Sequence, residues 1–208
     1  MDAIVGLLSG VRARGAFLLR SVLDPPWALR IEDRAPLSLL AVVDGQGWVI
    51  ADGEAAIRMA AGDVAIVRGP DHYVVADDPS SVPSVVIHPG QRCTTLGGAD
   101  LALTMRLGVR TWGNSDHGAT VLLTGTYQGD REMGNRLLLA LPAVVVVRAT
   151  TWDSPLVRLL SQEIVKDEPG QEVVLDRLLD LLLIAVLRTW FTRPAPMPRR
   201  GGRRTPIR

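Results

Sequence analysis

The sequence predicts a mainly β domain, a barrel or sandwich, followed by a C-terminal pair of antiparallel helices. Short runs rich in valine and isoleucine recur roughly every ten residues as far as residue 127, with turn-forming residues between them. Beyond residue 127 the pattern changes to helical periodicity. The chain has 208 residues, 47% of them hydrophobic, so it can bury the core of one domain with an appended helical segment.

The β part begins near residue 16, after a short amphipathic helix expected over residues 2–8. The runs predicted as strands are 17–19, 27–31, 37–43, 48–50, 55–59, 64–67, 73–76, 85–88 and 120–127. Asp44-Gly45 and Asp52-Gly53 suit tight hairpins, because glycine adopts positive φ at little cost. Strands of this length and spacing are typical of an antiparallel sandwich or barrel.

The helical part follows the last of these strands. A short helix is expected over residues 132–141, ended by Pro142, and the β-branched run 143–147 predicts a strand or a buried extended linker. Ser154-Pro155 suits a helix start, because serine caps amides and proline is preformed for the first turn. That helix is expected to end near residue 167, and a longer one is expected over residues 171–191.

The longer helix is apolar all round in its second half, residues 181–187. Such a helix must be covered on both sides. The same helix of a second copy is the simplest cover, which predicts a homodimer through residues 153–191. The alternative is that the helix lies in a groove of its own barrel. The expected dimer contacts are Leu178, Leu182, Ala185 and Val186.

Charge is distributed unevenly along the chain. Residues 193–208 hold six of the 23 basic residues, all arginine, and no acid, so residues 1–192 carry 17 basic against 22 acidic residues. This mildly acidic part of the chain is not expected to bind DNA, because phosphate binding needs clustered Lys and Arg. The composition divides the chain into a barrel (1–148), a helical dimerisation segment (149–192) and a disordered Arg/Pro/Gly-rich tail (193–208).

Cys93 is the only cysteine, so no internal disulfide can form, which suits a reducing compartment. The longest apolar runs fall far short of the ~20 residues that span a bilayer. The N-terminus shows no secretory signal. The expected location is the cytoplasm, with no contact to membranes.

A resemblance narrows these expectations. In residues 62–72 a Gly-Asp turn opens a strand and a glycine precedes His72 by three positions, which resembles the second motif of cupin barrels. Five further segments carry a second resemblance: 24–27 (DPPW), 86–95 (VIHPGQRCTT), 122–127 (LLTGTY), 152–156 (WDSPL) and 167–171 (DEPGQ). In these segments the chain resembles the sensor domain of AraC-type transcription regulators, in the cupin subgroup common in actinobacteria.

The resemblance covers about residues 1–193 and implies a barrel that binds a small-molecule effector, then dimerising helices, then two helix-turn-helix units. No room for those units follows Phe191, since each needs ~50 residues. The expectation is therefore an effector-sensing regulator without its DNA-binding half, with a tail that is truncated or out-of-frame coding. Such a chain could act only through mixed dimers with a full-length relative, or not at all.

Enzymatic cupins hold a metal through two histidines and an acid of their first motif together with the second-motif histidine. Residues 36–43, before the turn at Asp44, contain neither histidine nor acid, and only His72 matches. The chain is therefore expected not to be an enzyme. The alternative is a small metal-dependent cupin enzyme that uses His72 with His88 or Cys93.

His88 and Cys93 lie five positions apart across a Pro-Gly turn. Imidazole and thiolate suit zinc, and a cysteine near a histidine can be a low-pKa redox sensor. The opposing interpretation is a buried core cysteine and a histidine at a strand end. No other cofactor is expected.

The effector is expected to contact apolar and polar side chains of the barrel strands, although each of these could equally be ordinary packing. The candidates are Trp27, Arg30, Trp48, His72, Tyr73 and Tyr127. Arg30 and Arg68 could anchor an anionic effector, or could belong to a solvated strand face.

Overall fold

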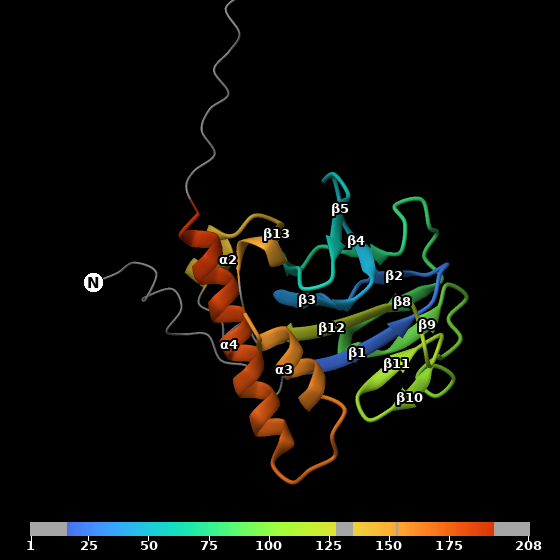
Figure 1. The fold of residues 1–208 in the computed structure, drawn as a ribbon. Coiled ribbons are helices and arrows are strands. Elements are labelled where there is room, and N and C mark those ends of the chain that lie inside the picture. Colours follow the sequence, from blue (N-terminus) through green and yellow to red (C-terminus); the bar gives the residue numbers. More distant parts are fainter. Residues whose placement is uncertain (1–15, 128–134, 153, 194–208) are drawn as a thin grey trace, which may run out of the picture.

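The computed structural model describes residues 16–127, 135–152 and 154–193, and it contains two β-sheets with helices gathered on one side (Figure 1). The first sheet has the strand order β10 (Arg106–Gly108), β11 (Thr111–Gly113), β1 (Phe17–Leu23), β12 (Thr120–Tyr127), β3 (Leu37–Asp44), β6 (Val64–Arg68) and β13 (Val144–Val147). The second has the order β5 (Ile57–Ala60), β4 (Gln46–Ala51), β7 (Tyr73–Ala76), β2 (Ala28–Ile31), β8 (Val85–Ile87) and β9 (Cys93–Thr95).

The predicted fold class, mainly β with C-terminal helices, is confirmed. Most neighbouring strands are antiparallel, but β1 pairs with β11 in parallel and β2 pairs with β8 in parallel, so both sheets are mixed. Parallel neighbours need long crossover connections. The chain supplies them by passing from one sheet to the other between these strands.

Two apolar clusters organise the interior, one on each face of the seven-stranded sheet. Alternate residues of β3 show the division: Leu40 and Val42 belong to the cluster between the sheets, whereas Leu39 and Ala41 belong to the cluster under the helices. A strand buried on both faces needs an unbroken apolar run, as residues 37–43 nearly provide.

Three α-helices cover the outer face of that sheet: α2 (Asn135–Ala140), α3 (Leu156–Glu163) and α4 (Gln171–Phe191). The long helix α4 crosses the side of the barrel, and α3 lies beside its first half (Figure 1). Gly125 of β12 allows α4 to approach closely. A Cβ at that position would lie 2.6 Å from Cδ1 of Leu179. The strands and helices therefore share one core.

This packing corrects the expected dimer contacts. Leu182 and Val186 are fully buried in the core that α4 shares with the barrel of the same chain. They cannot also contact a second copy, whereas Leu178 and Ala185 are only partly buried. One face of α4 thus lies against the chain's own barrel, as the alternative prediction stated.

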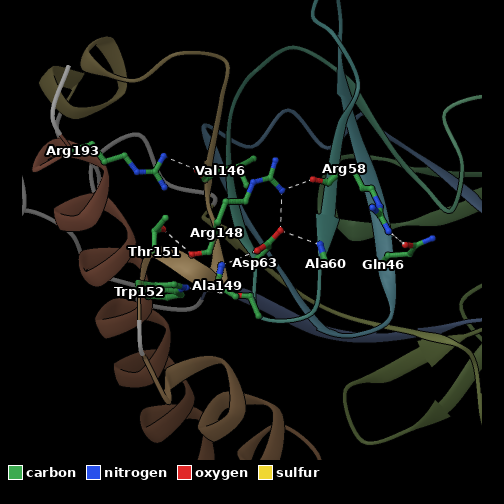
Figure 2. Close-up of polar contacts among 11 residues, drawn as sticks. Gln46, Arg58, Ala60, Asp63, Val146, Arg148, Ala149, Thr151, Trp152 and Arg193 are labelled. Carbon is green, nitrogen blue, oxygen red and sulfur yellow. Dashed lines mark hydrogen bonds and ion pairs between the residues drawn. The ribbon is translucent and has the colours of Figure 1, made fainter. Parts of the chain in front are cut away.

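The connection from barrel to helices is fixed by Asp63, in the Gly-Asp turn before β6 (Figure 2). Its carboxylate accepts hydrogen bonds from the amides of Ala60 (3.0 Å) and Ala149 (2.8 Å) and from the guanidinium of Arg148 (2.9 Å). Burial alone would raise the pKa of Asp63, but these hydrogen bonds together outweigh burial and lower it. The turn therefore holds the short 3-10 turn Ala149–Thr151 that leads toward α3.

Several predictions of the sequence lie outside the described residues, namely the helix over 2–8, the start of the helix over 132–141, and the tail beyond residue 193. Strands β9, β10 and β11 were not predicted, and each has only three residues. The run 143–147 is a strand, β13, paired with β6. None of the helices in the described ranges is both long and apolar enough to cross a membrane.

Candidate functional site

A narrow cavity lies between the two sheets. The centre of a water-sized sphere can occupy about 40 Å³ of it. Its described lining comes from both sheets and from the 3-10 turn Pro89–Gln91. Most of the wall surface is apolar, and half of the lining residues have wholly apolar side chains: Phe17, Leu19, Leu29, Ile31, Leu40, Val75, Ile87 and Leu122. The more polar lining residues are Ser21, Asp33, Tyr73, Gln91, Cys93, Trp112, Thr124 and Thr126. An apolar cavity with a few polar groups is typical of small-molecule sites.

Three polar atoms of this wall have no hydrogen-bond partner among the described residues. They are the hydroxyl of Tyr73, the indole N–H of Trp112 and the hydroxyl of Thr126, and all three side chains are buried. Buried polar groups are almost always paired in folded proteins, because leaving one unpaired costs about 1–3 kcal/mol. Three such groups around one cavity leave donors free for an acceptor within it.

Tyr73 stays uncharged at neutral pH. Burial raises the pKa of its hydroxyl strongly, the nearby Ser38 hydroxyl lowers it by less, and the carboxylate of Asp33 raises it by less again. The Ser38 hydroxyl does not reach hydrogen-bond geometry with Tyr73. Tyr73 therefore presents a neutral O–H group to the cavity.

Asp33 and Gln91 form part of the partly buried rim of the cavity. The Gln91 side-chain amide donates to Asp33 at 3.1 Å, and the Ala35 amide donates to the same carboxylate at 3.1 Å. Gln91 has a left-handed backbone, with φ of 62°, which non-glycine residues rarely adopt. The Asp33 carboxylate therefore has partners of its own and lies at the rim.

A larger open groove of about 630 Å³ lies between the start of β1 and the first half of α4. Its lining includes Phe17 and Gln91, which also line the cavity. Arg110 donates to the side-chain oxygen of Gln171 at 2.6 Å and lies 3.5 Å from the carboxylate of Glu172. The wall formed by Phe17 and Gln91 thus separates the cavity from the groove against α4.

The sequence matches a family model described as cupin over residues 2–192. The chain belongs to the cupin family. No curated protein matches the sequence.

Solved structures similar to this cupin include apo ToxT from Vibrio cholerae strain SCE256, with 8% identity, a TM-score of 0.48, and coverage of 87% of this chain and 59% of that one. YhaK from Escherichia coli has 12% identity, a TM-score of 0.35, and coverage of 65% and 42%. An uncharacterised double-stranded β-helix protein from Klebsiella pneumoniae has 11% identity, a TM-score of 0.30, and coverage of 63% and 91%. The chain thus spans less than two thirds of the length of the ToxT and YhaK chains.

Of the residues that the sequence proposed for effector binding, Tyr73 lines the cavity of this cupin. Trp27 is buried in the same apolar cluster but is not part of the lining. Tyr127 lies on the opposite face of β12, in the core under the helices, where its hydroxyl donates to the backbone oxygen of Leu179 at 3.4 Å. Of these three, only Tyr73 can contact a ligand between the sheets.

The other three proposed residues also lie outside the cavity. Arg30 forms an ion pair of 2.6 Å with Glu32 and is partly exposed, and Trp48 is half-buried on the outer side of β4. His72 is exposed, 3.8 Å from the carboxylate of Asp52. Arg68 does not line the cavity either. Neither arginine is therefore placed to anchor a ligand there.

His88 and Cys93 are not brought together as a zinc or redox pair. The ring of His88 lies 2.8 Å from the hydroxyl of Thr94, whereas Cys93 lines the cavity and its thiol contacts the backbone oxygen of Gln91 at 3.6 Å. His88 shares a surface depression with His72 instead. No group of three or more His, Cys, Asp or Glu side chains in the described residues is placed to hold a metal.

The charge state of Cys93 also opposes the redox hypothesis. Burial raises the pKa of its thiol, and Asp100 adds to the increase. A redox-sensor cysteine needs the opposite shift, because the thiolate is the reactive form. Cys93 is therefore a neutral, small part of the cavity wall.

Sequence reasoning missed Trp112 and Thr126. Trp112 belongs to β11, a short strand that the sequence pattern did not indicate. Thr126 belongs to a predicted strand and is the neighbour of Tyr127, but it is Thr126 that points between the sheets. The alternation along residues 122–126 was the signal that could have found it.

Proposed function

We propose that this chain is the effector-sensing and dimer-forming part of an AraC-type transcription regulator, with the effector held in the cavity between the sheets. The observation that carries the proposal is the set of three unpartnered buried donors at Tyr73, Trp112 and Thr126. Membership of the cupin family and the sequence segments that resemble AraC-type sensors support it. In this proposal, helix-turn-helix units outside residues 1–208 recognise the DNA bases.

The dimer part of the proposal rests on the outward face of α4. Val174 is 46% exposed and Leu181 is 52% exposed. Leu178, which lies between them, and Ala185, one turn after Leu181, are partly buried. Spacings of four, three and four residues place these four side chains along one seam, as in paired helices. The same helix of a second copy is the occupant we propose for this seam.

A metal-dependent cupin enzyme remains the alternative. It needs three metal ligands at one point, and neither the first-motif region nor the side-chain placement in the described residues supplies them. The proposal therefore assigns no catalytic reaction and no metal to this chain.

Thermal unfolding in the presence of a small-molecule library tests the effector site. A ligand at about 100 times its Kd stabilises a protein by about 2.7 kcal/mol, which for a chain of this size raises the Tm by roughly 5–10 °C. The Val75→Phe variant adds a ring to the cavity wall and should lose this response, with circular dichroism showing that it still folds. Trp48→Phe, on the outer side of β4, is the control and should respond like the wild type. Hits that stabilise Val75→Phe as much as the wild type would contradict the site.

A further inference from the structure

The chemical character of the cavity wall limits which ligands it can take. Among the described lining residues there is no lysine, arginine or histidine, and Asp33 at the rim is the one acidic side chain. Tyr73 and Cys93 are kept neutral by burial. The wall thus offers no positive charge to a ligand.

This lack of positive charge bears directly on acidic ligands. Moving a carboxylate or phosphate out of water is costly unless a cation or several donors replace the lost solvation. The Asp33 carboxylate at the rim would add repulsion to that cost. An acid would therefore enter this cavity at a large disadvantage compared with a neutral molecule of the same shape.

The three unpartnered groups define what a suitable ligand must carry. The indole N–H of Trp112 can only donate, and the hydroxyls of Tyr73 and Thr126 can donate to an acceptor that lies in the cavity. A ketone, ester or ether oxygen accepts hydrogen bonds without bringing a charge. The rest of the wall is mainly apolar and favours a hydrocarbon body.

Resting on the function proposed above, we infer that the cavity selects a compact, uncharged, mainly apolar molecule with a hydrogen-bond acceptor, and rejects carboxylates and phosphates. The narrow space restricts the body to a single ring at most.

Two matched sets of compounds test this inference. One is acetophenone, isopropylbenzene and benzoate; the other is cyclohexyl methyl ketone, isopropylcyclohexane and cyclohexanecarboxylate. Each set holds the ring and approximate size constant and changes only the acceptor or the charge. Affinities are measured by calorimetric titration and by the shift in Tm on the full chain. We expect the ketones to bind about five- to tenfold more tightly than the hydrocarbons, the gain of about one net hydrogen bond. The acids should bind more weakly still.

Conservative variants assign the selectivity to two of the donors. Tyr73→Phe and Thr126→Val each remove one donor with little change of shape. Each should weaken ketone binding several-fold, leave hydrocarbon binding unchanged, and leave the Tm of the unliganded chain equal or higher, because the lost group had no partner. Tyr127→Phe is the matched control. It makes the same chemical change on the other face of the seven-stranded sheet and should leave all affinities unchanged.

The outcomes separate the inference from the proposed function. Acids that bind more tightly than the ketones, and that Val75→Phe excludes, would overturn the inference and leave the effector site standing. Hydrocarbons that bind as well as ketones would overturn the role of the donors in the same way. Failure of every compound in both sets to bind, together with no hit in the library, would overturn the inference and the proposed function together.

Discussion

Asp63 has the densest set of polar contacts described for any single carboxylate of the chain. Hydrogen bonds from Ala60, Ala149 and Arg148 join the turn before β6 to the segment that leads into the helices (Figure 2). The Trp152 indole donates to the backbone oxygen of Gly62 at 3.4 Å and strengthens the same junction. The Gly-Asp turn of the cupin motif therefore acts here as a structural anchor.

We predict that Asp63→Asn lowers the free energy of unfolding by about 2 kcal/mol at pH 7, the scale of a lost charge-assisted hydrogen bond. The pKa of Asp63 is lowered in the folded chain from its usual 3.8. Its contribution is therefore complete above about pH 5 and is lost as pH falls below 3.8 through the folded pKa. Urea unfolding at pH 7 and at pH 3 measures the effect. A difference between wild type and variant that stays constant down to pH 2 would contradict this role, and Asp116→Asn, in an exposed loop, is the control.

Cys93 provides a second prediction for a single residue. Because burial raises the pKa of its thiol, the native chain at pH 8 should react with a disulfide reagent at least tenfold more slowly than the same chain unfolded in urea. Absorbance after addition of the reagent gives both rates. Equal rates in the native and unfolded chains would revive the redox-sensor hypothesis.

The orientation of single side chains is where sequence reasoning was weakest. In a strand, neighbours point to opposite faces, and a shift of one residue exchanges inside for outside. Arg30, Trp48 and Tyr127 were expected inside, but Ile31, Val49 and Thr126 beside them take the interior positions. The predictions favoured large or polar side chains, whereas the alternation along the whole strand determines which side chains point into the interior.

Among the elements, α4 has two apolar faces with different roles. Leu179, Leu182, Leu183 and Val186 pack on the barrel. The seam of Val174, Leu178, Leu181 and Ala185 is more exposed, and Leu178 at its edge also packs against the core. The sequence correctly indicated a helix that is apolar all round in its second half. It could not assign the two faces, because nothing in the periodicity says which stripe meets the barrel.

Two substitutions at adjacent positions of α4 test this division. Leu181→Asp places a charge on the outward seam and should give a folded monomer, because the interior core is untouched. Leu182→Asp buries a charge in the shared core and should destabilise the fold by several kcal/mol. Light scattering gives the mass and circular dichroism gives the folded state. A wild-type chain that is monomeric at high concentration would contradict the dimer.

Most strand and helix positions were predictable from sequence because glycine, proline and aspartate mark the turns between them. The strand run 64–67 and the helix 171–191 agree with β6 and α4 to within a residue. The segment containing β9, β10 and β11 was missed because three-residue strands leave no period to detect. The parallel pairing of β1 with β11, which brings Trp112 to the cavity, joins residues about 90 positions apart and leaves no local signal.

In the whole molecule, the cavity and the groove against α4 meet at the wall formed by Phe17 and Gln91. A ligand between the sheets would press on the inner side of this wall, and α4 lines the groove on its outer side. The site that we propose for the effector and the helix that we propose for the dimer are therefore separated by this wall and the groove beside it. This short path gives the proposed sensor a physical means of linking occupancy to the dimer.

The indole N–H signals in a ¹⁵N-labelled sample test the central claim, that a small molecule occupies this cavity, most directly. The chain has five tryptophans, so few signals need to be assigned. When a stabilising ketone is added, the account predicts that the Trp112 signal moves downfield as its N–H gains an acceptor, while the signal of Trp48 on the outer side of β4 stays in place. A ligand that stabilises the protein but shifts Trp48 and leaves Trp112 unchanged would contradict the account.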